Sequence, residues 1–165
     1  MVGHAIMELI DVNGSDTRRI SHALKVLGFA RAIAEAEGLD GDALSVVELT
    51  AVLHDIAIRH CEEKYGSASG RLQEKEGPAI ALPILKRCGA SDAVADRVAY
   101  IIAHHHTYTD IDGPDYQIIV EADFLVNRDE GEFTQEAFLN FVRRYFVTKA
   151  GREMARRMFG TEQSE

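Results

Sequence analysis

The sequence predicts an all-α protein, a single-domain helical bundle of about seven or eight helices. Apolar residues recur at helical spacing through most of the chain. Alternating β-branched runs and Asn-Gly hairpins are missing, apart from the isolated Asn13-Gly14. With 165 residues, of which 46% are hydrophobic, the chain is long enough to bury one core. We expect one domain over residues 1–165, in which C-terminal helices over 134–159 pack onto a core over 16–127.

The first half of the chain is predicted to form helices over residues 1–14, 16–37, 45–55 and 59–65. Ser15-Asp16 is typical of a helix start, and Gly38 suits the position just after a helix end. Ser45-Val46-Val47-Glu48 has the form of a capping box, which predicts a turn over residues 39–43 before it. A Gly- and Ser-rich loop over 66–70 follows the short helix.

The second half begins with a helix that is expected to open at Glu76-Gly77-Pro78, since proline suits the first turn of a helix. Pro83 should kink it. Ser91 predicts the cap of the next helix, over 92–105, which finishes in three consecutive histidines. A polar loop over 107–114, a helix around residues 118–125 and a last group of helices that starts at Thr134 complete the chain.

The composition excludes several classes of protein. With 27 acidic and 18 basic residues, the net charge is −9, which argues against a general nucleic-acid or membrane binder. No stretch has the roughly 20 apolar residues that a membrane span needs, and the start does not resemble a secretory signal. Cys61 and Cys88 lie far apart, so we expect packing residues in a reducing compartment and a cytoplasmic location.

The chemistry of the chain is centred on the doublet His54-Asp55, which ends an apolar run. Histidine and carboxylate are mixed ligands that suit a divalent or iron centre. The side chains of adjacent residues on a helix point about 100° apart. Both can therefore reach one ion only if the ion lies beside the edge between them or if the helix ends at this point. His22 lies in an earlier helix and Asp123 in a later one. A buried Asp123 needs a metal or a polar partner, a cap or an arginine being the alternatives.

The order of these residues resembles the HD superfamily of metal-dependent phosphohydrolases. Four stretches carry the resemblance, which are Arg19-Ile20-Ser21-His22, Leu53-His54-Asp55-Ile56, Ile101-Ile102-Ala103-His104-His105 and Glu121-Ala122-Asp123-Phe124-Leu125. The resemblance implies one or two divalent ions, of Mn, Ni, Co, Mg or Fe. The ligands that it implies for the first ion are His22, His54, Asp55 and Asp123, with Asp55 able to bridge two ions.

Members with two metals carry extra histidines between the doublet and the last aspartate. By resemblance, the matching positions here are Glu76 and the pair His104-His105, which are therefore candidate ligands of a second ion. As alternatives, Glu76 is a carboxylate favoured at a helix start, and His104 to His106 are a solvated turn at a helix end. Ile58 stands where the HD-GYP branch has lysine, and the Gly-Tyr-Pro signature is missing, which argues against a cyclic dinucleotide phosphodiesterase.

The implied function is hydrolysis of a phosphate ester or anhydride in a small molecule, for example a nucleotide. The ion would activate a water that Asp55 helps to orient. Arg19, one turn before His22, and Lys64 would bind the phosphate of this substrate, with a surface salt bridge as the alternative for Arg19 and a solvated role as the alternative for Lys64. His104, if it is not a ligand, would donate a proton to the leaving oxygen.

Two other classes of function stay open from the sequence. One is a dinuclear-iron oxygenase, because the HD fold also hosts that chemistry. The other is a non-catalytic regulatory module that binds a metal or nucleotide. Residues 145–159 are interpreted as an arm that packs on the core, with a contact in a homodimer as the alternative.

Overall fold

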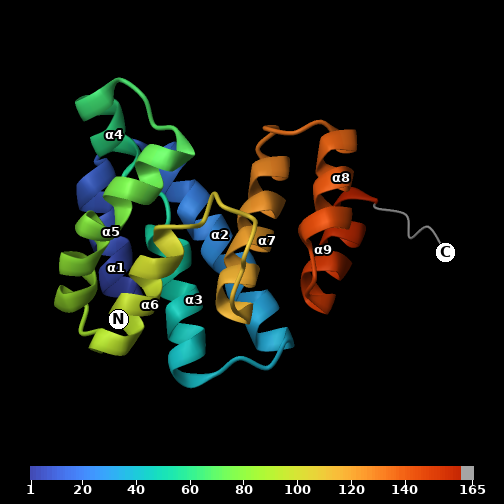
Figure 1. The fold of residues 1–165 in the computed structure, drawn as a ribbon, viewed down its shortest axis with the longest axis horizontal. Helices are drawn as coiled ribbons and strands as arrows, with labels where there is room; N and C mark the ends of the chain where they lie inside the picture. The colour runs from blue at the N-terminus through green and yellow to red at the C-terminus, as the bar shows by residue number, and fades with distance from the viewer. Residues whose placement is uncertain (161–165) are drawn as a thin grey trace.

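The computed structural model describes residues 1–160, which form nine α-helices and no strand (Figure 1). The helices are α1 (Val2–Asn13), α2 (Thr17–Ala36), α3 (Gly41–Leu53), α4 (Ile58–Tyr65), α5 (Gly70–Arg87), α6 (Asp92–Ile102), α7 (Pro114–Asp129), α8 (Gln135–Tyr145) and α9 (Lys149–Phe159). The all-α prediction is confirmed. The number of helices exceeds the expected seven or eight, since an extended residue, Phe146, separates α8 from α9. Residues 161–165 of the expected domain lie outside the described part.

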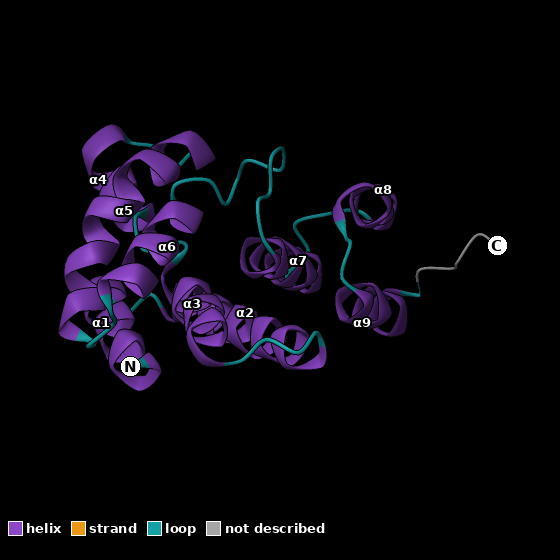
Figure 2. Cartoon of the chain, turned by 60° about the horizontal axis from the view of Figure 1, so that its bottom comes forward, coloured by secondary structure: helices purple, strands orange, loops and turns teal. Residues whose placement is uncertain are grey.

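Helices α2 and α3 pack side by side through the middle of the bundle (Figures 1 and 2). Helices α1 and α6 cover one side of this pair, with α5 packed against α6, and α7 packs on the other. The core between them consists of fully buried aliphatic side chains, including Ile33, Leu49, Leu53, Ile101 and Ile118. Burial of such apolar surface is the main drive for folding, at about 25 cal/mol per Å². The central helices are therefore firmly held, and they carry the first residues of the site described below.

Several predicted helix starts are found where the sequence placed them. The side chain of Asp16 accepts a hydrogen bond from the backbone N–H of Arg19, so it caps α2. Ser91 caps α6 and Thr134 caps α8 in the same way, through the third residue after each. These caps depend on residues within one turn of the helix start, which explains why the sequence alone reveals them.

Two predicted starts are wrong. Helix α3 begins at Gly41, so Ser45 is not a capping residue but lies inside the helix, where its hydroxyl donates to the Gly41 carbonyl oxygen at 3.1 Å. Helix α5 begins at Gly70, six residues before Glu76. No side-chain cap marks that start, and the helix is held by a buried face that repeats at helical spacing along Gln73, Gly77, Ala81, Ile84 and Leu85.

The helix that was predicted over residues 92–105 ends earlier, at Ile102. A Cβ atom at Gly77 would lie 2.5 Å from the Cγ2 atom of Ile102, so glycine allows α5 and α6 to approach closely at this point. The three histidines that follow lie in a turn. The phenolic hydroxyl of Tyr116 hydrogen-bonds to the carbonyl oxygens of His104 and Thr107 and so fixes that turn onto α7.

Helices α8 and α9 lie beyond α7 and contact it (Figures 1 and 2). Phe138 and Phe146 are completely buried there, and α9 also reaches α2. Cys61 and Cys88 are buried free thiols, as a packing role predicts. Within the described chain, none of the helices has the length and apolar character that crossing a bilayer requires.

Candidate metal centre

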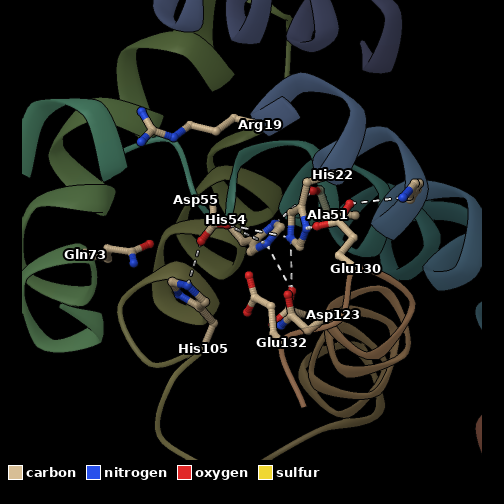
Figure 3. A network of polar contacts seen from close by, with 12 residues as sticks. Arg19, His22, Ala51, His54, Asp55, Gln73, His105, Asp123, Glu130 and Glu132 are labelled. Atoms are coloured by element: carbon tan, nitrogen blue, oxygen red, sulfur yellow. Dashed lines mark hydrogen bonds and ion pairs between the residues drawn. The ribbon is translucent and has the colours of Figure 1, made fainter. Parts of the chain in front are cut away.

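The doublet His54-Asp55 lies just past the last residue of α3, in the turn that leads into α4. This turn is what allows two adjacent side chains to face the same place. The Nε2 atom of His54 lies 3.4 Å from Oδ2 of Asp55. His22 on α2 approaches from a second direction, with its Nε2 atom 3.7 Å from the same oxygen. Asp123 on α7 closes the group, with its Oδ1 atom 3.1 Å from His22 and 3.7 Å from His54 (Figure 3).

The structure assembles two groups of candidate ligands, which meet at Asp55. In the first, His22, His54 and Asp123 each offer one atom, and these atoms lie within 4.8 Å of one another. In the second, the same holds for Asp55, His105 and His106. The Oδ2 atom of Asp55 faces the first group, while its Oδ1 atom lies 3.6 Å from Nε2 of His105. Asp55 therefore stands between the two groups.

Hydrogen bonds to backbone carbonyls fix two of the imidazole rings. The Nδ1 atom of His54 donates to the Ala51 oxygen at 2.9 Å, and that of His105 donates to the Ile102 oxygen at 2.8 Å. In the neutral form of each ring the Nε2 atom then carries a lone pair, and both Nε2 atoms are buried without a hydrogen-bond partner among residues 1–160. Buried nitrogen atoms are seldom left unpaired in this way. An imidazole held through Nδ1 with a bare Nε2 is the form that binds a metal ion.

His22 is oriented by a carboxylate rather than by the backbone. Its Nδ1 atom donates to Oε2 of Glu130 at 3.0 Å, and Lys25 donates to Oε1 of Glu130 at 3.1 Å. A carboxylate behind a histidine ligand is a common outer partner in metal sites. The sequence interpretation missed Glu130. Its signal was the spacing Asp123, Asn127 and Glu130, which places all three on one face of α7, where Asn127 also donates to Asp123 at 3.0 Å.

The electrostatics of the cluster suit a cation. Burial would raise the pKa of Asp55 and Asp123, but the neighbouring histidines hold both well below the usual range. Burial would lower the pKa of His54, yet the charges of these two aspartates raise it to about 9. The carboxylates thus keep a positive charge in the place where a metal ion would bind. Metal binding would displace that proton.

Glu76, a candidate ligand from the sequence, lies apart from both groups. Its carboxylate accepts from the Tyr65 hydroxyl at 2.7 Å and from Lys64 at 3.2 Å, and it lies 3.3 Å from Nε2 of His60. The hydrogen bonds from Tyr65 and Lys64 lower its pKa to about 2. The physical reason is the early start of α5, which puts Glu76 in the middle of that helix instead of at its beginning.

His104 is also directed away from the cluster. Its Nδ1 atom donates to the Tyr100 carbonyl oxygen at 2.7 Å, and the two rings lie 4.4 Å apart. His106, which the sequence analysis did not select, joins His105 instead. The expected histidine pair is therefore displaced by one residue along the chain. The cause is the end of α6 at Ile102, after which the turn no longer follows helical spacing.

A cavity of about 330 Å³ opens onto the cluster, and its wall includes His22, Asp55, Asp123 and Arg19. Arg19 is ion-paired with Glu62 at 2.7 Å and with Asp16 at 3.3 Å. Lys64, the other predicted phosphate-binding residue, is 47% exposed and pairs with Glu76. Of the two cations, Arg19 is thus the one that the structure places at the cavity.

A comparison with protein-family models matches residues 19–142 to the HD domain. The match spans most of the chain, so the protein belongs to the HD-domain family, and the resemblance seen in the sequence is confirmed. The members of this superfamily are mostly metal-dependent phosphohydrolases. Neither the curated proteins nor the solved structures gave a match. Imidazole nitrogens and carboxylate oxygens in two adjoining groups form a donor set that fits divalent ions.

Proposed function

We propose that this protein is a metal-dependent phosphohydrolase that cleaves a phosphate ester or anhydride of a small molecule, for example a nucleotide. The observation that carries the proposal is the position of Asp55, whose two oxygens face two groups of candidate ligands. Mn, Ni, Co, Mg and Fe are the ions that such mixed nitrogen and oxygen ligands suit.

In this proposal His22, His54, Asp55 and Asp123 hold the first ion. Asp55 with His105 and His106 holds the second. The ions, when bound, supply Lewis acidity toward the phosphoryl oxygen and lower the pKa of water. Asp55, fixed at the helix end between the two groups, orients the attacking water. Glu76 and His104 have no part in the proposed ligand set, because each is engaged elsewhere.

Arg19 is proposed to bind the substrate phosphate. It lies at the cavity wall, three residues before His22 on α2, so the two side chains share a helix face. Its side chain is 27% exposed, and its guanidinium is held by Asp16 and Glu62, which position it without enclosing it. A fixed cation beside the metal cluster would stabilise charge on the phosphoryl group during transfer. Lys64 is left out because it pairs with Glu76 outside the cavity wall.

The test is an assay of phosphate esters and anhydrides on protein stripped of metal and then supplied with Mn²⁺, Co²⁺, Ni²⁺ or Mg²⁺. We expect hydrolysis that needs the metal and is lost in His54→Ala. His4→Ala is the matched control, since His4 lies on α1 with a 53% exposed side chain. Hydrolysis that persists in His54→Ala, or that needs no metal, would overturn the proposal.

A dinuclear-iron oxygenase is the second candidate, favoured by the same bridging position of Asp55 between two ligand groups. It predicts two tightly bound iron ions, consumption of oxygen with an organic substrate and no release of phosphate. Metal analysis of protein purified without chelator, together with an oxygen electrode, separates the two. Retained metal without turnover in either assay would instead favour a regulatory module that binds metal or nucleotide.

A further inference from the structure

Gln73, on the first turn of α5, carries a buried polar atom that the ligand groups above leave unexplained. The side chain is only 6% exposed, and its Nε2 atom donates to the Ala68 carbonyl oxygen at 2.9 Å. Since only the amide nitrogen can donate, this bond fixes which end of the amide is which. The Oε1 atom is buried and has no hydrogen-bond partner in the described chain. In Figure 3 the Gln73 side chain is drawn on the same side of the cluster as Asp55 and His105.

The start of α5 is packed directly against the histidine turn. A Cβ atom at Gly70 would lie 2.8 to 2.9 Å from atoms of the His106 side chain, so only glycine fits there. Glu74 accepts from the backbone N–H of His106 at 3.1 Å and from the Thr107 hydroxyl at 2.9 Å. Residues 70, 73 and 74 share one helix face, so Gln73 faces the same region.

Gln73, Asp55 and His106 line the same cavity. The Nε2 atom of His106 is also buried and unpaired within residues 1–160. Two bare polar atoms, an amide oxygen and an imidazole nitrogen, therefore belong to residues that line this cavity together with Asp55. A buried amide oxygen without a partner is unfavourable unless something else satisfies it. A cation bound in this cavity would satisfy both atoms and the Asp55 carboxylate at once.

We propose that Gln73 is a ligand of the second ion, which it binds through its amide oxygen alongside Asp55, His105 and His106. The inference rests on the proposed function, because it deepens the two-ion site described there. The amide oxygen is a neutral, hard ligand of the kind that suits Mn²⁺ and Mg²⁺. It makes the second site different in donor set from the first, which has two imidazoles and two carboxylates. The second site is accordingly the weaker of the two.

The test measures metal binding and not turnover. Full-length protein stripped with chelator is titrated with MnCl₂ by calorimetry, and free Mn²⁺ is counted by electron paramagnetic resonance. The wild type should bind two ions in two steps. Gln73→Leu, which keeps the approximate shape and removes the oxygen, should leave the first step unchanged. It should weaken the affinity of the second step by about 10–100-fold or more, since loss of an outer partner of a metal ligand already costs that much.

Two further variants complete the design. Gln135→Leu is the matched control, because Gln135 also opens a helix and donates to a backbone carbonyl, that of Phe159 at 2.6 Å, but lies on α8. It should bind two ions as the wild type does. Gln73→Glu keeps a ligand oxygen and should keep the second step, which guards against a folding defect in Gln73→Leu.

Each outcome separates this inference from the proposed function. A second step that is equal in Gln73→Leu and wild type, or that is lost in Gln73→Glu as well, would overturn the role of Gln73 and leave the hydrolase standing. A wild type that binds one Mn²⁺ ion would also overturn it, while a one-metal hydrolase remained. A wild type that binds no metal would instead remove the proposed function itself.

Discussion

Helix α7 carries two carboxylates two residues apart, Glu121 fully buried and Asp123 13% exposed, and the regions that they face differ completely. Asp123 faces the histidines of the candidate metal centre, which hold its pKa well below the usual range despite burial. Glu121 is fully buried on the side of α8 and α9, and there burial raises its pKa more than its hydrogen bonds lower it. The same element thus presents a charged group to one region and a group with a raised pKa to the other.

The partners explain this difference. Within residues 1–160, the donors to Glu121 are all neutral, namely the Gln117 amide, the backbone N–H groups of Val147 and Thr148 and the Thr148 hydroxyl. These donors satisfy its oxygens and leave nothing for a ligand to add. Asp123 instead meets histidines, one of which keeps a bare nitrogen within the described residues. Burial alone therefore does not indicate a functional carboxylate. An incomplete set of hydrogen-bond partners around it does indicate one.

The largest effect should come from Asp123→Asn, which removes the charge and keeps the shape. We expect loss of the first ion and a fall in kcat/KM of about a thousandfold, since metal catalysis supplies several kcal/mol and each 1.36 kcal/mol is about tenfold. Metal content and steady-state kinetics measure this. Asp11→Asn on the surface of α1 is the control. An Asp123→Asn protein with normal metal content would contradict the assignment.

The next largest effect should be on stability, from Glu121→Ala. The change strands buried N–H groups at the start of α9 and is expected to lower the free energy of unfolding by about 2–4 kcal/mol. Urea unfolding measures it, with Glu136→Ala on exposed α8 surface as the control. Metal bound per folded molecule should not change. If it fell as it does in Asp123→Asn, the two regions would not be independent.

A smaller effect is expected from Glu130→Ala, because Glu130 orients His22 without facing the cluster itself. Loss of such an outer partner should weaken metal binding by about 10–100-fold. Glu130→Gln keeps an oxygen for the His22 Nδ1–H group and should recover part of the affinity. Calorimetric titration with Mn²⁺ gives both values. Equal loss in the two variants would mean that charge, and not orientation, is what Glu130 provides.

The smallest effect concerns pH and Glu121→Gln. A carboxyl group whose pKa is raised by folding stabilises the protein below its unfolded pKa, about 4.3, and loses that contribution as pH rises through the folded pKa. The wild type should therefore lose stability relative to Glu121→Gln as the pH rises from about 4 toward neutrality. Chemical unfolding at several pH values measures this difference. A difference that grows in favour of the wild type would show that the hydrogen bonds of Glu121 outweigh its burial.

Local patterns were enough to predict most helices and the order of the first ligand group. Asp16, Ser91 and Thr134 cap helices through bonds that span three residues. The wrong predictions share one cause, which is that contacts with distant parts of the chain set a helix boundary. Pro78 suggested a helix start, but the start of α5 is held by contacts with His106, far along the chain. That difference is why Gln73, and not Glu76, reaches the cavity.

The histidine run shows the same limit. The spacing Ile-x-x-His-His pointed to His104 and His105, and a continuous helix would have set their directions. The structure ends α6 at Ile102 and ties the turn to α7 through Tyr116, which turns His104 outward and His106 inward. A tertiary hydrogen bond between segments twelve residues apart has no signature in the local sequence.

The sequence by itself determined the all-helical fold, the HD-domain family and the order of His22, His54, Asp55 and Asp123, because helical periodicity and caps depend on neighbouring residues and the order of motifs is read directly along the chain. Only the tertiary structure decided which side chains come together at the candidate site. Glu130 behind His22, Gln73 at the cavity wall and the grouping of His106 rather than His104 with Asp55 all depend on how α5, α6 and α7 pack together. Packing of the helices fixes the direction in which each side chain points, whereas spacing along the chain does not.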